Sequence, residues 1–118
     1  MFRIAICDDD AVERKSIEDD VLAYSSKHPQ RTVKVEVFSS GFEMLESFEK
    51  TREPDVVLLD ICMPGMLGTE LAHEILSRSE NTNIIFLTTS ADFAVDAFSL
   101  HVSDYIKKPY TQERFEAA

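Results

Sequence analysis

The stretch D-V-V-L-L-D at residues 55–60 decides the fold, because it places an unbroken apolar run directly before an aspartate. A short run that is apolar throughout is typical of a central parallel strand covered on both faces. A similar run, Ile84–Leu87, leads into Thr88, and Arg3–Cys7 leads into Asp8-Asp9. We therefore expect several buried parallel strands that each end at polar side chains.

Segments with apolar residues at helical spacing separate these strands. Asp10 is placed to cap a first helix that ends near Ser25, and Ser40 is placed to cap a second, shorter helix. A third helix follows Gly68, and a weaker one is indicated around residues 93–98. The apolar positions of these helices are Ile17, Val21, Tyr24, Met44, Leu45, Phe48, Leu71, Ala72, Ile75, Leu76, Phe93, Val95, Ala97 and Phe98.

Two further strands complete the pattern. Val33–Val37 alternates between apolar and polar residues, which suits a half-exposed edge strand. Asp104–Lys107 precedes Lys108, and a last helix starts at Thr111. The order of elements predicts an α/β fold of the (βα)₅ type, with one five-stranded parallel sheet and helices on both faces.

Length and composition bound the function. A chain of 118 residues with 44% apolar content and eight Phe suits a single domain with one core. The net charge of −10 opposes contact with nucleic-acid phosphates, so this chain alone should not bind DNA. We interpret the charged residues of the first helix as ordinary solvated surface: Glu13, Arg14, Lys15, Glu18, Asp19 and Asp20.

We expect a cytoplasmic protein without membrane contact, since no apolar stretch approaches the roughly 20 residues of a membrane span and no signal sequence precedes the first strand. Cys7 and Cys62 are isolated, so we read them as small reduced hydrophobes and not as a redox pair. The histidines do not cluster with the carboxylates in this topology, and none is assigned to a metal: His28, His73 and His101.

The carboxyl ends of parallel strands meet at one edge, where open α/β folds place their chemistry. Asp8, Asp9 and Asp60 should converge there with Thr88 and Lys108. Carboxylates that lie so close together repel one another unless a cation lies between them. A site made only of oxygen ligands suits a hard ion such as Mg²⁺. The arrangement predicts a metal-assisted phosphoryl site.

The site residues, in their order along the predicted (βα)₅ pattern, resemble those of the receiver domains of two-component response regulators. The resemblance covers residues 1–118 and depends on Asp8-Asp9, on L-L-D-I-C-M-P-G at residues 58–65, on Thr88 and on Lys108-Pro109. It implies a flavodoxin-like receiver fold with strand order 2-1-3-4-5. The phrase A-D-F-A-V-D-A-F-S-L-H-V-S-D-Y-I-K-K-P at residues 91–109 is similar to receivers of the LytTR type.

The resemblance implies that Asp60 accepts a phosphoryl group from a sensor histidine kinase, so the chain is a phosphoacceptor and not a conventional enzyme. Mg²⁺ would be bound by Asp9, Asp60 and the backbone carbonyl of Cys62, with Asp8 acting mainly through a bound water. Asp8 could instead cap the first helix, but we assign that cap to Asp10.

Three further roles follow from the resemblance. Lys108 would pair with a phosphoryl oxygen; alternation along the strand sends Lys107 to the opposite face. Thr88 would donate a hydrogen bond to the phosphoryl group, and Tyr105 would then rotate inward as the switch. Thr89 departs from the small Ala that the family often has at that position.

The same resemblance implies that the output surface is the face made by Phe93, Phe98, Tyr105 and the last helix, which would also serve a homodimer. That helix, Thr111–Ala118, has barely two turns, which favours a domain cut from a longer protein. The missing output domain would be a DNA-binding transcription regulator.

Three alternatives remain open at this point. An aspartyl phosphatase would need a second Asp where Cys62 stands. A flavodoxin-like cofactor carrier would need a phosphate-binding Gly-rich loop where Asp8–Asp10 stands. A degenerate receiver used only for protein contacts would not need the complete set of site residues.

Overall fold

The computed structural model describes residues 2–30, 32–48, 50, 53–61, 63, 65–79, 81–88, 102–108 and 110–117. These residues form β1 (Phe2–Cys7), α1 (Ala11–Lys27), β2 (Val33–Phe38), α2 (Gly41–Phe48), β3 (Val56–Leu59), α3 (Gly68–Arg78), β4 (Asn83–Thr88), β5 (Asp104–Lys107) and α5 (Gln112–Ala117). The helix expected around residues 93–98 lies outside the described residues.

The strands form one parallel sheet in the order β2-β1-β3-β4-β5, which confirms the predicted order. The register pairs Cys7 of β1 with Leu59 of β3, and Leu59 with Phe86 of β4. At the far side, Thr88 of β4 pairs with Lys107 of β5. The carboxyl ends of these strands therefore meet at one edge, as the sequence predicted.

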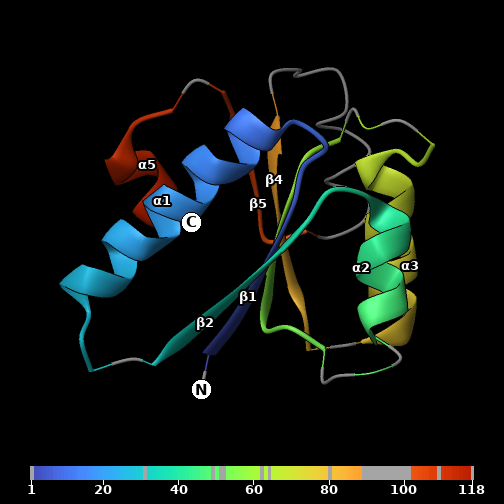
Figure 1. Cartoon of the computed structure of the whole chain (residues 1–118), viewed down its shortest axis with the longest axis horizontal. Coiled ribbons are helices and arrows are strands. Elements are labelled where there is room, and N and C mark those ends of the chain that lie inside the picture. The colour runs from blue at the N-terminus through green and yellow to red at the C-terminus, as the bar shows by residue number, and fades with distance from the viewer. Residues whose placement is uncertain are drawn as a thin grey trace.

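Helices cover both faces of the sheet (Figure 1). The α1 and α5 helices lie on one face, and α2 and α3 lie on the other. Successive residues of each strand point to opposite faces, so the strands contribute to two clusters of buried side chains. One cluster joins Ala5 and Val57 to α2 and α3, and the other joins Ile6 and Leu58 to α1 and α5.

Capping fixes where the helices begin. The carboxylate of Asp10 accepts hydrogen bonds from the backbone N–H of Val12 at 2.9 Å and of Glu13 at 3.3 Å, so α1 starts at the predicted cap. The Ser40 hydroxyl likewise accepts from the Glu43 N–H at 3.2 Å ahead of α2. The α1 helix continues to Lys27, slightly beyond the predicted end near Ser25.

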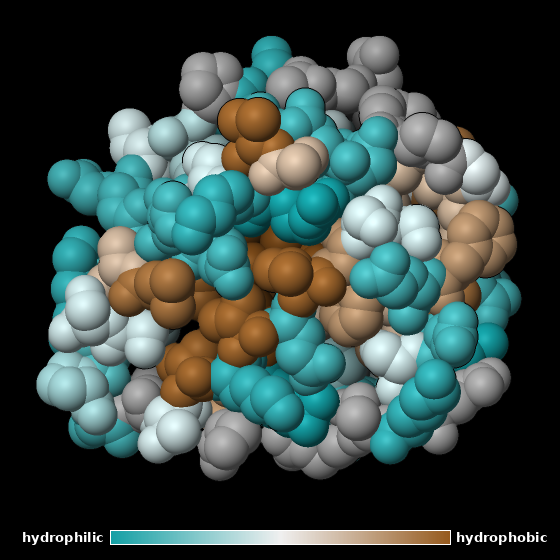
Figure 2. Space-filling model, viewed as in Figure 1, coloured by the Kyte–Doolittle hydropathy of each residue, from teal (hydrophilic) through white to brown (hydrophobic). Residues whose placement is uncertain are grey.

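The short α5 helix reaches the sheet through Phe115, which is buried in the cluster with Ile17 and Val21 of α1. Beside Phe115 a hollow of about 160 Å³ opens, lined mainly by apolar side chains of α1 and of the strands. Figure 2 shows apolar side chains gathered at the centre of this view. None of the helices in the described ranges combines the length and the apolar character needed to cross a membrane.

Candidate functional site

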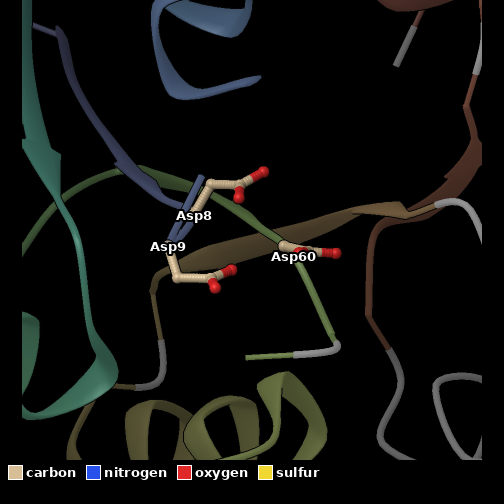
Figure 3. Close-up of side chains that lie close together, drawn as sticks. All are labelled: Asp8, Asp9 and Asp60. Carbon is tan, nitrogen blue, oxygen red and sulfur yellow. The ribbon is translucent and has the colours of Figure 1, made fainter. Parts of the chain in front are cut away.

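The carboxylates of Asp8, Asp9 and Asp60 come together at the carboxyl edge of the sheet (Figure 3). Asp8 and Asp9 follow β1, Asp60 follows β3, and one oxygen from each carboxylate lies within 4.8 Å of the others. The neighbouring strands bring them together, since the Asp60 N–H donates to the Cys7 carbonyl at 3.0 Å. Such a set of closely spaced oxygens fits a hard divalent cation.

Asp8 is the most buried of the three, with 1% of its surface exposed. Its Oδ1 accepts a hydrogen bond from the Asp10 N–H at 3.0 Å, and its Oδ2 accepts one from Lys108 Nζ at 3.0 Å. Arg14 Nη1 donates to the backbone carbonyl of Asp8 at 2.8 Å. These contacts compensate the burial of a charged group, which would otherwise be costly.

Lys108 brings a cation to this cluster from the end of β5. Its N–H donates to the Thr88 carbonyl at 2.7 Å, and its Nζ lies 3.0 Å from Asp8 Oδ2 and 3.1 Å from Glu13 Oε2. Burial alone would lower the pKa of Lys108, but the carboxylates of Asp8 and Glu13 outweigh it and raise the pKa. These contacts hold Lys108 at the acidic edge, whereas Lys107 is exposed.

Asp60 is half-buried at the end of the central strand β3. Burial, followed by the negative charge of Asp8, raises the pKa of its carboxyl above the ordinary value, although Lys108 works against that rise. Its Oδ1 accepts a hydrogen bond from the Ile61 N–H at 2.9 Å. The site therefore holds more negative charge than Lys108 balances, and a bound cation would relieve the repulsion.

Thr88 and Tyr105 lie on neighbouring strands of the same half of the sheet. Thr88 is fully buried at the carboxyl end of β4. Tyr105 is half-buried on β5, where it pairs in register with Phe86 and packs edge-on against its ring, with centroids 6.1 Å apart. Both therefore occupy the β4–β5 half that the sequence predicted for them, while Phe93 and Phe98 lie outside the described residues.

Cys7 is buried under the carboxylates, and its thiol donates to Met63 Sδ at 3.7 Å. Burial, followed by the charge of Asp8, raises the pKa of this thiol to about 12, which opposes thiolate chemistry. Cys62, whose backbone carbonyl was predicted as a metal ligand, lies outside the described residues.

The histidines take no part in the acidic cluster among the described residues. His28 follows the carboxyl end of α1, where its ring Nδ1 lies 3.0 Å from the Tyr24 carbonyl. His73 is exposed on α3, and His101 lies outside the described residues.

The interpretation of the first-helix charges as ordinary solvated surface is wrong for Glu13 and Arg14, and also for Asp20, whose carboxylate accepts a hydrogen bond from the Tyr110 hydroxyl at 2.7 Å. Glu13 pairs with Lys108, and Arg14 contacts the carbonyl of Asp8. The sequence contained one signal for the roles of Glu13 and Arg14, because both lie in the first turns of a helix that starts directly after Asp8 and Asp9. Gly68 was also missed as a site residue, although α3 begins there against the backbone of Asp60.

Comparison with protein families gives one match over almost the whole chain. The model described as the response regulator receiver domain matches residues 4–118. The chain is 36% identical to the transcriptional regulatory protein NatR of Bacillus subtilis over 120 residues, covering 100% of this chain and 48% of NatR. It is 37% identical to the sensory transduction protein LytT of Oceanobacillus iheyensis over 81 residues, covering 67% of this chain and 32% of LytT.

Solved structures show the same fold. The response regulator TrrA of Thermotoga maritima in complex with Mg²⁺ and beryllofluoride has a TM-score of 0.84 at 26% identity, covering 99% of this chain and 95% of TrrA. The response regulatory domain of mrkE from Klebsiella pneumoniae has a TM-score of 0.86 at 25% identity, covering 98% of this chain and 90% of that domain. The chain spans less than half the length of the curated relatives NatR and LytT.

Proposed function

The chain belongs to the family of response regulator receiver domains, the signalling domains of two-component systems, and from this premise we propose that Asp60 accepts a phosphoryl group from a sensor histidine kinase. The observation that carries the proposal is the acidic cluster of Asp8, Asp9 and Asp60 with Lys108 paired to it. Membership of this family removes the aspartyl-phosphatase and flavodoxin-like alternatives.

In the proposed step, an oxygen of Asp60 attacks the phosphorus of the kinase's phosphohistidine. The phosphorus–nitrogen bond breaks, the imidazole nitrogen keeps the electron pair, and an acyl phosphate forms on Asp60. Asp60 is better placed for attack than Asp8, because Asp8 is buried with both oxygens engaged in hydrogen bonds. The chain is in this sense a phosphoacceptor that assists its own phosphorylation and its slow dephosphorylation.

The three carboxylates would hold Mg²⁺, and the Cys62 carbonyl would be a further ligand. The fit rests on chemistry, since the cluster offers several anionic oxygens within 4.8 Å and Lys108 balances only part of their charge. When bound, Mg²⁺ neutralises charge on the oxygens of the transferring phosphoryl group. Lys108 would pair with one such oxygen and Thr88 would donate a hydrogen bond to another. The complex of TrrA with Mg²⁺ and beryllofluoride supports this assignment.

Mg²⁺ is expected to raise the melting temperature of the wild-type protein. An ion that binds only the folded state stabilises it by about 1.4 kcal/mol at ten times the dissociation constant. Asp9→Asn should lose most of this rise, since it removes an exposed ligand without disturbing the buried Asp8–Lys108 pair. Thermal melts over a MgCl₂ series measure the effect, and a full rise in Asp9→Asn would place the ion elsewhere.

The output of the domain is the regulation of transcription in our proposal. NatR is a transcriptional regulatory protein, and the chain spans about half of it, which leaves room for a second domain in such relatives. Its likeness to LytT supports a LytTR-type, DNA-binding output domain. The proposed output face includes Tyr105 and α5, and it would change when Thr88 binds the phosphoryl group, favouring a homodimer or release of the output domain.

Beryllofluoride with Mg²⁺ should mimic the phosphorylated state and, besides the signals of residues next to Asp60, shift the backbone NMR signals of β4 and β5 well beyond those of α3. The reason is that Thr88 ends β4, and Tyr105 packs against Phe86 one strand away. Exposed residues of α3 such as His73 serve as the internal reference. If β5 signals stay within the range of α3 while those near Asp60 move, the β5 face is not the switch.

A further inference from the structure

The ammonium group of Lys108 lies between two carboxylates of different character. Asp8 is almost fully buried, whereas the Glu13 side chain is 44% exposed at the start of α1. Both pairs are close, at 3.0 Å to Asp8 and 3.1 Å to Glu13. Within the described ranges, these two are the ion-pair partners of Lys108, and Asp60 is not among them. In this state the ammonium group of Lys108 pairs with Asp8 and Glu13 and not with Asp60, the proposed phosphoacceptor.

The local structure of α1 makes Glu13 available for this contact. A glutamate three residues after a helix cap often reaches back to the N–H of the capping residue. Here the N–H of Asp10 donates to Asp8 Oδ1 at 3.0 Å instead. The Asp10 carboxylate caps the helix on its own, through Val12 and Glu13 N–H. The carboxylate of Glu13 therefore serves Lys108 and not the cap.

We propose that Glu13 is a positioning residue that competes with the phosphoryl group for Lys108, an inference that rests on the proposed function of Asp60. To pair with a phosphoryl oxygen on Asp60, Lys108 has to exchange part of its present contacts. Asp8 lies in the acidic cluster, so a cation bound there would neutralise part of the charge of Asp8 and weaken the attraction between Asp8 and Lys108. Glu13 lies outside that cluster and keeps its full attraction.

This competition sets how readily the domain enters its activated state. A carboxylate that stabilises Lys108 in the resting position lowers the gain from the lysine–phosphoryl contact by the same amount. Because Glu13 is half-exposed, its ion pair has the modest strength of surface pairs and acts as a tuning element and not as a block. Removing its charge should thus favour the phosphoryl-bound state.

The test compares Glu13→Gln with Asp10→Asn, each of which removes one negative charge near the site. Asn also caps helices well, so Asp10→Asn keeps α1 intact and controls for the general electrostatic effect on an anionic ligand. Beryllofluoride affinity at saturating Mg²⁺ is measured by calorimetry or by NMR titration. Glu13→Gln should bind beryllofluoride about two- to fivefold more tightly than Asp10→Asn does, the range expected for one half-exposed ion pair. Equal affinities in the two variants, or weaker binding in Glu13→Gln, would overturn the inference.

A spectroscopic readout tests the contact itself. The side-chain NMR signal of Lys108, identified by its loss in Lys108→Met, should move in Glu13→Gln with Mg²⁺ present and before beryllofluoride is added. It should stay in place in Asp10→Asn, and movement of equal size in both variants would mean that Glu13 does not hold the lysine. If the wild-type protein itself binds no beryllofluoride with Mg²⁺, the proposed function fails. If the wild-type protein binds beryllofluoride and Glu13→Gln changes neither the affinity nor the Lys108 signal, only the positioning role of Glu13 is contradicted.

Discussion

Asp60→Asn is expected to abolish the phosphoryl adduct. Intact-mass analysis after incubation with acetyl phosphate and Mg²⁺ should show one added phosphoryl group on the wild-type protein and none on the variant. The reason is that Asn has no carboxylate oxygen with which to form an acyl phosphate, while Asp8 is buried and paired to Lys108. An adduct that persists in Asp60→Asn would show that another residue is the acceptor.

In the absence of metal, Asp60→Asn should have a higher free energy of unfolding than the wild type. That result would exclude unfolding as the cause of the lost adduct. The pKa of Asp60 is raised by burial and by Asp8, so its ionised form costs stability in the folded state. The cost is absent below the ordinary carboxyl pKa and is complete above the raised one. Because Asp60 is half-exposed, we expect a gain of a few tenths to about 1 kcal/mol at neutral pH, which disappears as the pH is lowered.

The fold was readable from the sequence because its signals are local. Four apolar residues before Asp60, and the alternation in Val33–Val37, each reflect how many faces of a strand are buried. The caps at Asp10 and Ser40 depend on side chains within three residues of the helix start. The sheet order was different in kind, since it came from the resemblance to a family and not from any local pattern.

The site was readable only in part, for a physical reason. The end of a parallel strand predicts which residues share an edge, and this placed Asp8, Asp9 and Asp60 together. It does not predict which side chains reach that edge from the flanking helices. Glu13 reaches Lys108 across 95 positions of sequence, a contact that depends on where the start of α1 lies relative to the residue after β5. The spacing of residues along the chain does not by itself predict such a contact.

Gly68→Ala is expected to destabilise the fold strongly, although helix propensity argues for the opposite. In helices Ala is favoured over Gly, by about 1 kcal/mol at interior positions, and Gly68 is the first residue of α3. Here a Cβ on residue 68 would lie 2.2 Å from the Asp60 carbonyl oxygen and 2.7 Å from the Ile61 Cα. Both are backbone atoms of the chain directly after β3, so relief requires α3 to move away from the sheet edge. We expect a loss of roughly 2–3 kcal/mol, the upper part of the range for overpacked sites.

Gly41→Ala is the matched control, because it makes the same change at the first residue of α2. Its Cβ would lie 3.1 Å from Met66 Sδ and 3.2 Å from Leu71 Cδ2, which are ends of flexible side chains. Chemical denaturation should therefore show a change below about 1 kcal/mol for Gly41→Ala and a much larger one for Gly68→Ala. The Gly68→Ala protein that remains folded should also lose Mg²⁺-dependent stabilisation, since the strain acts on the backbone that positions Asp60. Equal stability of the two variants would mean that α3 can shift freely, and that Asp60 is not positioned by its close contact with Gly68.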